Sequence, residues 1–391
     1  VKIGATSFAS YGLVSDSAFW FGNTESADGP VHSNVGILMD GSSNGDVTST
    51  NSTYTVPSGL APSSLQGTTQ PGVWCQTTVT TPVNCNTRDK SDWRYPVPSV
   101  DFNQVSSALC NIKKKAFAAV ASTSSLANLT NACSQVPTTR TASYLPQRST
   151  TGSYSLTNGY LIELNTNGTY NLYTVAGEND QATGYASALT ETLVASNVTP
   201  VSDGIIFAED NVWVRTNPTF SGRLTIASGR LASSTVSTNI VIADDVAYGV
   251  KTGADALGLI AENSVILAPY AIPQTGSFNF EVNAAIIAMT GDVIYPLYYR
   301  TNSTRCTKGW TATNQTFNFF GSIATRQSWT WTWSLGSSSC GNAALNGSTY
   351  MTGVLNNTTK YDTNLEYAPP PSYPLTSGHN ILSWREVLTT P

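Results

Sequence analysis

The chain has few charged residues and almost no histidine. Charged side chains make up 11% of its 391 residues, about half the share in an ordinary globular protein, and there are two histidines. No two cysteines stand in a C-x-x-C spacing, so a zinc cluster is not expected. No apolar run reaches the roughly 18 residues that a membrane-spanning helix needs. The sequence therefore predicts neither a metal nor a cofactor, and no membrane span.

Serine, threonine, asparagine and glycine are abundant instead. An apolar share of 40% and an aromatic share of 10% are too high for a disordered chain. The six cysteines are even in number and fall into three local pairs, which favours disulfide bonds over metal binding. The simplest of the 15 possible pairings joins Cys75 to Cys85, Cys110 to Cys133 and Cys306 to Cys340. Together these features predict an extracellular protein.

A similar phrase recurs four times: a short apolar run, one to three turn-forming residues and a second apolar run. The four copies are Ile205–Val214, Ile240–Tyr248, Leu259–Leu267 and Ile286–Tyr295. Each reads as a strand, a tight polar corner and a strand, which is what one coil of a β-solenoid needs. The alanines at positions 208, 243, 261 and 288 lie 35, 18 and 27 residues apart. The predicted fold class is therefore mainly β, a right-handed β-solenoid (β-helix) with an inserted α+β domain.

Three regions follow from the patterns along the chain. Residues 1–50 read as N-terminal solenoid coils with Gly and Asn corners. Residues 51–199 read as an inserted, loop-rich α+β region that carries two of the expected disulfides. Residues 200–391 read as the main β-solenoid, with an aromatic cap and a proline-rich C-terminal tail that must lie along the outside, because proline cannot continue a strand ladder.

The insertion carries helix and hairpin signals. Asp101 is a good N-cap, and apolar residues follow it at helical spacing at Val105, Leu109, Ile112, Ala116 and Ala119. A second helical stretch is expected near Leu126–Cys133. Asn167-Gly168 predicts a hairpin turn between Tyr160–Leu164 and Thr169–Tyr173.

Several phrases together resemble a known family. Gly29–Asn34, Gly204–Val214, Leu257–Leu267 and the ending from Tyr361 to Glu386 resemble the ectodomains of large minor pilins of bacterial type IV pilus systems, the PilX-like group with a β-solenoid ectodomain. The resemblance covers about residues 1–50 and 200–390. A pilin also carries an N-terminal apolar helix, which this sequence does not contain, so we expect that helix to have been removed ahead of Val1.

The resemblance implies a place on the cell surface or a pilus, with other pilins as partners. Membrane contact is implied only through the missing N-terminal helix. For members linked to natural competence, the resemblance also implies the capture of DNA.

One segment is basic although the chain carries a net charge of −5. Between residues 80 and 150, eight cations face three carboxylates. DNA phosphates would be attracted to such a segment, and Trp93 could stack on bases. The candidate residues for binding DNA or another polyanion are Arg88, Lys90, Arg94, Lys113, Lys114, Lys115, Arg140, Arg148 and Trp93. The alternative is a solvated helix face, since three consecutive lysines point in three directions on a helix.

Trp329, Trp331 and Trp333 alternate with threonine, as on one face of a strand. We interpret them as a cap over the open end of the solenoid. The alternative is an aromatic platform for sugar rings or bases.

A polysaccharide-degrading β-helix enzyme would need convergent carboxylates. The candidates all lie near coil corners, at Glu209, Asp210, Asp244, Asp245, Glu262 and Asp292. Turns select such residues for their hydrogen bonds to the backbone, and corner side chains are expected to point outward. For His32 we expect a structural hydrogen bond. The leading hypothesis is thus a non-enzymatic, pilus-associated protein that binds DNA, and the alternative is an adhesin for glycans or host protein.

Overall fold

The computed structural model describes residues 2–60, 62, 64–78, 84–118, 133–148, 158–179, 182, 185–201, 203–233, 235–271, 278–296, 315–336, 344–346, 349–354 and 356–383. The fold is mainly β, as expected, and contains one α-helix among these residues, α1 (Asn103–Ala118). None of the described helices is long and apolar enough to span a bilayer.

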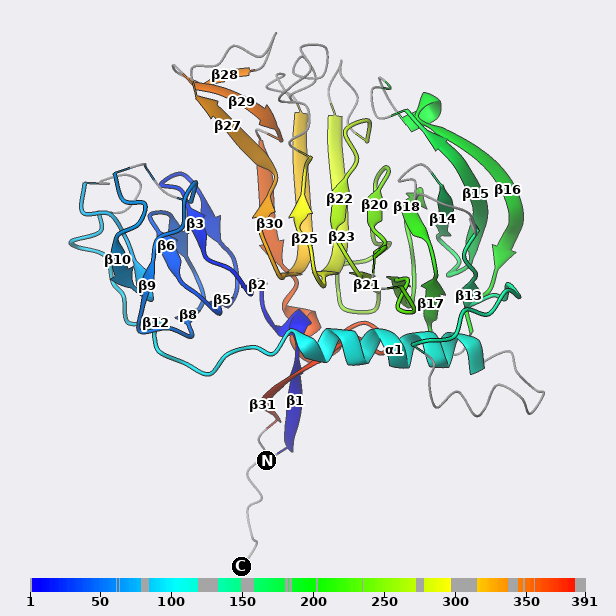
Figure 1. The fold of residues 1–391 in the computed structure, drawn as a ribbon, viewed down its shortest axis with the longest axis horizontal. Helices are drawn as coiled ribbons and strands as arrows, with labels where there is room; N and C mark the ends of the chain where they lie inside the picture. Colours follow the sequence, from blue (N-terminus) through cyan, green and yellow to red (C-terminus); the bar gives the residue numbers. More distant parts are fainter. Residues whose placement is uncertain are drawn as a thin grey trace, which may run out of the picture.

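A long sheet of parallel strands runs through the molecule (Figure 1). In spatial order its strands are β12 (Trp93–Arg94), β8 (Val47–Ser49), β5 (Val31–Ser33), β2 (Leu13–Ser15), β25 (Gln315–Thr325), β23 (Phe278–Ala288), β21 (Ala256–Ala261), β19 (Arg223–Ser228), β17 (Ile205–Ala208) and β13 (Tyr144–Leu145). A further parallel strand, β30 (Asn357–Tyr361), also pairs with β25. Because β2 pairs with β25, the strands from the start of the chain continue the stack built by its C-terminal half.

A second set of strands stacks in the same order beside the long sheet. One sheet holds β16 (Leu189–Val198), β15 (Tyr170–Glu178), β14 (Gly159–Asn165), β18 (Asn211–Asn217), β20 (Ile240–Ile242), β22 (Val265–Leu267), β24 (Val293–Ile294) and β26 (Trp329–Thr330). A smaller sheet holds β11 (Val73–Trp74), β6 (Ile37–Met39) and β3 (Phe19–Phe21). From β17 to β26 the chain alternates between the long sheet and the second set, and each such pair of strands forms one coil.

The remaining strands form short pairs. In the terminal ribbon, β1 (Lys2–Ser7) and β31 (Leu375–Ser383) are antiparallel. The other strands are β4 (Ser26–Ala27) with β7 (Ser42–Ser43), β9 (Thr53–Thr55) with β10 (Thr69–Pro71), and β29 (Thr349–Gly353) between β27 (Thr332–Gly336) and β28 (Ala344–Asn346). Short 3-10 turns lie at Phe8–Ser10, Tyr185–Ser187 and Thr363–Glu366.

The long sheet is apolar on both faces over its C-terminal half. Along β21 all six residues are buried. Leu259 packs in the interior of the stack, whereas its neighbour Ile260 belongs to the cluster beneath α1. Parallel strands covered on both faces read as continuous apolar runs, which explains the apolar phrases of the sequence.

Helix α1 covers the outer face of the long sheet, and Figure 1 shows it running across the strands below the stack. Val105, Leu109, Ile112 and Ala116 are buried there, as their spacing predicts. The expected N-cap also holds, because the Asp101 carboxylate accepts a hydrogen bond from the Asn103 amide at 2.9 Å. Most of the second expected helix, Leu126–Cys133, lies outside the described residues.

The proline-rich segment lies against the same outer face, as expected. Arg223 donates hydrogen bonds to the carbonyls of Ala368 and Pro369, each at 2.7 Å, and Thr225 donates to the carbonyl of Pro371 at 2.5 Å. The chain then enters β31, so both terminal strands leave the stack together through the terminal ribbon (Figure 1).

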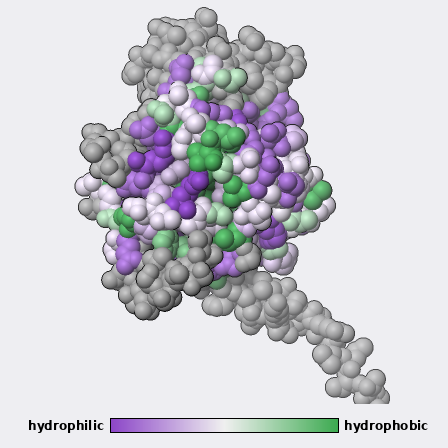
Figure 2. All heavy atoms as spheres, turned by 90° about the vertical axis from the view of Figure 1, so that its right-hand side faces the viewer, coloured by the Kyte–Doolittle hydropathy of each residue, from purple (hydrophilic) through white to green (hydrophobic). Residues whose placement is uncertain are grey.

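An antiparallel hairpin closes one end of the stack. β14 and β15 pair across the Asn167-Gly168 turn, with Leu164 opposite Tyr170, which confirms the predicted hairpin. β16 adds an outer antiparallel strand. Figure 2 looks at this end of the molecule and shows apolar atoms gathered within a mainly polar face. Leu193 of β16 is 54% exposed.

Small residues line one corner of most coils. The register of the long sheet places eight of them in a row: Ala208, Ser228, Ala261, Ala288, Thr325, Ser15, Ser33 and Ser49. Several of the hydroxyls donate to a carbonyl of a neighbouring coil; Ser33, for example, donates to the carbonyl of Ser17 at 2.9 Å. Ala243 was expected to belong to this row, but it follows β20 of the second sheet. The phrase Ile240–Tyr248 therefore begins with a strand of the second sheet instead of the long sheet. The long-sheet strand of that coil is β19.

The expected division of the chain into residues 1–50, 51–199 and 200–391 differs from the observed one. β11 pairs with β6 and β12 pairs with β8, so residues 51–100 continue the N-terminal coils. β13 and β14 likewise begin the second group of coils. Among the described residues of 51–199, α1 and its connections run outside the stack. The short strands of this region were not predicted, because strands of two residues leave little periodicity in the sequence.

Two of the expected disulfides are formed. Cys75 bonds to Cys85 and Cys110 to Cys133, with Cα–Cα distances of 5.8 and 5.2 Å. Cys306 and Cys340 lie outside the described residues. Disulfides are typical of proteins from oxidising compartments.

Candidate functional site

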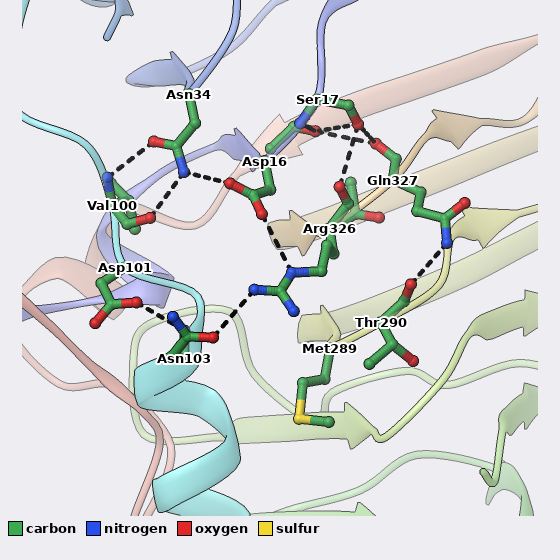
Figure 3. Close-up of polar contacts among 12 residues, drawn as sticks. Asp16, Ser17, Asn34, Val100, Asp101, Asn103, Met289, Thr290, Arg326 and Gln327 are labelled. Carbon is green, nitrogen blue, oxygen red and sulfur yellow. Dashed lines mark hydrogen bonds and ion pairs between the residues drawn. The ribbon is translucent and has the colours of Figure 1, made fainter. Parts of the chain in front are cut away.

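The N-terminal coils and the later coils, which begin at β13 and β14, meet at a junction held by partly buried polar contacts (Figure 3). Arg326, which follows β25, donates to the Asp16 carboxylate at 3.1 Å and to the Asn103 side chain at 3.3 Å. Asn34 donates to the other carboxylate oxygen of Asp16 at 2.6 Å. Asn34 also exchanges two hydrogen bonds with the backbone of Val100, at 2.8 and 2.9 Å. The junction thus links both groups of coils and the segment that enters α1.

Backbone carbonyls complete the junction. Ser17 donates to the carbonyls of Arg326 and Gln327, and Ser15 donates to the Gln327 carbonyl at 3.0 Å. The Gln327 side chain in turn donates to the Thr290 carbonyl at 2.7 Å, as Figure 3 shows. Residues more than 300 positions apart therefore share one corner of the stack.

A pocket of about 590 Å³ lies next to the junction, between the N-terminal coils and the terminal ribbon. We call it the ribbon pocket. Its walls come from β5, β8 and β12, from residues 97–100, from Tyr11, from Glu366 and from the ribbon. Because these segments lie far apart in the sequence, only the fold brings them together.

The change from apolar to polar residues on the outer face of the long sheet creates this pocket. In register, Val14 of β2 pairs with His32 of β5, His32 with Thr48 of β8, and Thr48 with Arg94 of β12. Beyond Val14, this row therefore carries polar side chains, and His32, Thr48 and Arg94 all line the pocket.

His32 is fixed in the pocket wall. Its Nδ1 lies 2.9 Å from the Thr48 hydroxyl and its Nε2 lies 3.0 Å from the Asn34 amide oxygen. Burial lowers the pKa of His32, while the hydrogen bond with Asn34 opposes this shift. The expected structural hydrogen bond of His32 is confirmed.

Two further residues of the pocket lining, Tyr11 and Glu366, carry polar groups that can still form hydrogen bonds. Neither the Tyr11 hydroxyl nor the Glu366 carboxylate makes a hydrogen bond or ion pair within the described part of the chain. The Tyr11 ring lies 6.0 Å from the ring of His32, tilted by 49°. At the pocket edge, Arg94 forms an ion pair with Asp46 at 2.5 Å, with both side chains about half exposed.

The basic residues that the sequence singles out do not form one surface. Lys113 is buried and forms an ion pair with Glu209 at 2.5 Å, so it is unavailable to any ligand. This position corrects the expectation that all three lysines of α1 can contact DNA. Its cause is the helix geometry, which turns Lys113 toward the long sheet.

Near the end of the N-terminal coils, Arg88 and Lys90 lie over the ring of Trp93, at 5.8 and 5.4 Å from its centre. Arg88 also donates to the carbonyls of Met39 and Asp40, at 2.5 and 2.9 Å. Trp93 itself packs against the core. Of this group, Lys90 and Arg94 are exposed, whereas the hydrogen bonds of Arg88 join its segment to residues 39 and 40.

The other predicted cations lie at the opposite end of α1. Lys114 and Lys115 are exposed in its last turns, and Lys115 donates to the Ser372 hydroxyl at 2.9 Å. Arg140 is exposed on the segment that leads to β13. Arg148 uses its guanidinium to hold the carbonyls of Gly159 and Val175.

The three tryptophans do not form a flat external platform, nor do they cap an end of the stack. Trp331 is buried, with its ring 5.2 Å from Phe317. The ring centres of Trp329 and Phe21, a residue of the N-terminal coils, lie 5.8 Å apart. The Trp333 indole donates to the Tyr295 carbonyl at 2.8 Å. Trp331 instead lies in the core and Trp329 packs against it, where the N-terminal coils meet the rest of the stack.

Most corner carboxylates accept hydrogen bonds from nearby backbone or hydroxyl groups. Asp210 accepts from the amides of Arg148 and Asn211, each at 3.1 Å, and Asp292 accepts from the Ser328 amide at 2.8 Å. Glu262 accepts from the Arg230 amide at 2.7 Å. The expectation that these side chains point outward is wrong for Glu209, Asp210 and Glu262, which are buried beneath the neighbouring segments.

Asp244 and Asp245 lie at another corner, close to Glu281. Burial raises the pKa of Asp245 to about 6, and the like charges of Asp244 and Glu281 add to that shift. The backbone amide of Glu281 donates to Asp245 at 2.8 Å. No group of three or more histidine, cysteine or carboxylate side chains suited to a metal ion is found among the described residues.

Sequence patterns singled out His32 and Arg94 but not the pocket that they both line. The available signal was the polar residues at positions 32, 48 and 94. Their alignment depends on the register of the parallel strands, which cannot be read from the sequence. Comparison with known proteins finds no matching family model, no matching curated protein and no matching solved structure.

Proposed function

We propose that the protein is an extracellular, pilus-associated binding protein without catalytic activity, similar to large minor pilins. In this proposal the stacked coils form a right-handed β-solenoid that carries binding surfaces away from an attachment point. The observation that supports it is the terminal ribbon, in which the first and last described strands, β1 and β31, pair and leave the stack together. A module attached through one such ribbon projects its whole stack outward.

The proposed ligand at the far end of α1 is DNA or another polyanion. Lys114, Lys115 and Arg140 are exposed there, whereas Lys113 is consumed by its ion pair. Lys114 and Lys115 also border a groove of about 560 Å³ between α1 and residues 372–375. Phosphate contacts need only accessible cations, and their strength falls steeply with salt.

The absence of catalysis is supported by three of the six corner carboxylates. Those of Asp210 and Glu262 accept hydrogen bonds from nearby backbone amides, and Glu209 pairs with Lys113. Acid–base catalysis requires carboxylates that reach a substrate.

Fluorescence anisotropy with a labelled DNA duplex tests the polyanion contact. We expect binding at low salt that weakens linearly on a log–log plot of affinity against salt concentration. The variant K114E/K115E should lose about tenfold or more in affinity. The control K251E/K360E changes the net charge equally at exposed lysines elsewhere and should bind as the parent does.

Equal binding by the two double variants, or no DNA binding at low salt, would contradict the polyanion proposal. Omitting Lys113 from the variant is essential, because replacing it would disturb the fold rather than the surface.

A further inference from the structure

We propose that the ribbon pocket binds a neutral saccharide, which contacts Tyr11 and the polar row on the outer face of β5, β8 and β12. This site is separate from the cationic end of α1 and does not depend on DNA binding. The inference rests on the position, the charge balance and the unused hydrogen-bonding groups of the pocket.

The position of the pocket suits a ligand site. Its volume of about 590 Å³ falls within the range of ~300–1,000 Å³ that is usual for small-molecule pockets. It lies where α1 and the proline-rich segment no longer cover the long sheet, beside a junction that is fixed by hydrogen bonds. A rigid wall of this kind requires little reorganisation when a ligand binds.

The charge balance disfavours ionic ligands. One cation, Arg94, is already paired with Asp46, and Glu366 adds a second carboxylate. A phosphate or sulfate group would meet two carboxylates and a guanidinium that is already neutralised. A divalent cation would lack its usual set of ligands, because no cluster of three such side chains exists in the described ranges.

The unused groups match a polyhydroxyl ligand. Sugar hydroxyls both donate and accept hydrogen bonds, so the carboxylate of Glu366 can accept from them. The Arg94–Asp46 ion pair is about half exposed and keeps further donor and acceptor positions. The Tyr11 hydroxyl can do either. The ring of Tyr11 offers an apolar face, and Thr6, Thr48 and Ser99 add hydroxyls to the lining.

His32 contributes by positioning the wall. Both of its ring nitrogens are occupied by Thr48 and Asn34, and burial lowers its pKa, so it presents a neutral, fixed ring beside Tyr11. Asn34 is also the residue that joins the junction, so the wall of the pocket and the junction are one hydrogen-bonded unit.

Isothermal titration calorimetry and saturation-transfer NMR on the whole chain test the proposal. The probes are glucose, galactose, N-acetylglucosamine, lactose and maltotriose, with inorganic phosphate and putrescine as charged comparisons. We expect at least one neutral saccharide to bind, with an affinity that does not change between low and high salt. Saturation transfer should reach the ring protons of the bound sugar.

Substitutions then locate the site. E366Q should weaken saccharide binding about tenfold, because a sugar hydroxyl loses a charged acceptor, and Y11F should weaken it about threefold to tenfold, because a neutral hydrogen bond is lost. The control Y367F removes a hydroxyl from the adjacent residue, which is 64% exposed and outside the pocket lining, and should bind as the parent does. S99W adds bulk at an exposed residue of the pocket edge and should block binding while leaving the fold intact.

Three outcomes would overturn the proposal. They are the failure of every neutral saccharide to bind below about 10 mM, preferential binding of phosphate or putrescine in this pocket, and saccharide binding that survives S99W unchanged. Circular dichroism of each variant confirms that a loss of binding is not a loss of folding.

Discussion

The ammonium group of Lys113 lies 2.5 Å from the carboxylate of Glu209, and both side chains are almost completely buried, at 2% and 1% exposed. Lys113 belongs to α1 and Glu209 follows β17, so the ion pair attaches the helix to the long sheet. Lys113 also donates to the Gln135 carbonyl at 2.5 Å, and the Tyr144 hydroxyl donates to Glu209 at 3.0 Å. The basic triplet of α1 therefore divides into one structural lysine and two surface lysines.

Removing the buried cation should destabilise the protein strongly. The variant K113M leaves Glu209 buried without its partner, and we expect the free energy of unfolding to fall by about 3–5 kcal/mol. Urea denaturation at neutral pH measures this change. The exposed neighbour provides the control, because K114M should change stability by no more than about 0.5 kcal/mol.

The double variant K113M/E209Q sharpens this test. It removes both charges, so it should recover much of the stability that K113M loses. Equal stability of K113M and K114M would show that Lys113 does not occupy a buried ion pair.

The carboxyl of Asp245 should make stability depend on pH. Burial, with the like charges of Asp244 and Glu281, raises its pKa in the folded protein to about 6, from an ordinary value of 3.8. The folded state thus holds this proton more tightly than the unfolded state. The resulting stabilisation is complete below about pH 4 and is lost as the pH rises through 6.

The variant D245N keeps an oxygen that can accept from the Glu281 amide and removes the charge. At about pH 7.5 it should be more stable than the parent by about 1 kcal/mol, a value reduced for the partial exposure of the site. Near pH 4 the two proteins should be alike in thermal denaturation. D203N, at an exposed position, serves as the control. A D245N protein that is less stable at pH 7.5 would refute this interpretation of the site.

Asn34 should be the most sensitive residue of the junction. N34A removes the contacts with Asp16 and with the backbone of Val100, so we expect a loss of about 1–2 kcal/mol, because partly buried partners lose their hydrogen bonds. Limited proteolysis should then cut near residues 97–102 more readily than in the parent. N86A, on an exposed loop, should show neither effect, and similar behaviour of N34A and N86A would argue against the junction.

Local patterns predicted much of the fold. The Asn167-Gly168 hairpin, helix α1 and three of the four repeated phrases depend on residues that are close in sequence, and the structure places them as expected. The burial of Lys113 also has a local signal, because it stands four positions after Leu109, on the same face of the helix as other buried residues.

Long-range pairing was not predictable in the same way. Coils that resemble one another can stack in several orders, and nothing local specifies that β2 pairs with β25. The ribbon pocket depends on that order, since it collects Tyr11, His32, Arg94 and Glu366 from four distant segments. Local patterns therefore predict the coils but not the pocket between the N-terminal coils and the ribbon.

An engineered disulfide between Ser15 and Thr325 tests most directly whether the N-terminal coils continue the C-terminal stack. These residues pair in register on adjacent strands, and such a spacing of about 5 Å lies within the range that a disulfide bridges. We predict that S15C/T325C forms a bond between the two peptides, identified by mass spectrometry. The matched control S15C/S228C uses the same row of corner residues four strands away and should form no such bond. Free cysteines at positions 15 and 325, or equal cross-linking in the control, would contradict a single continuous stack.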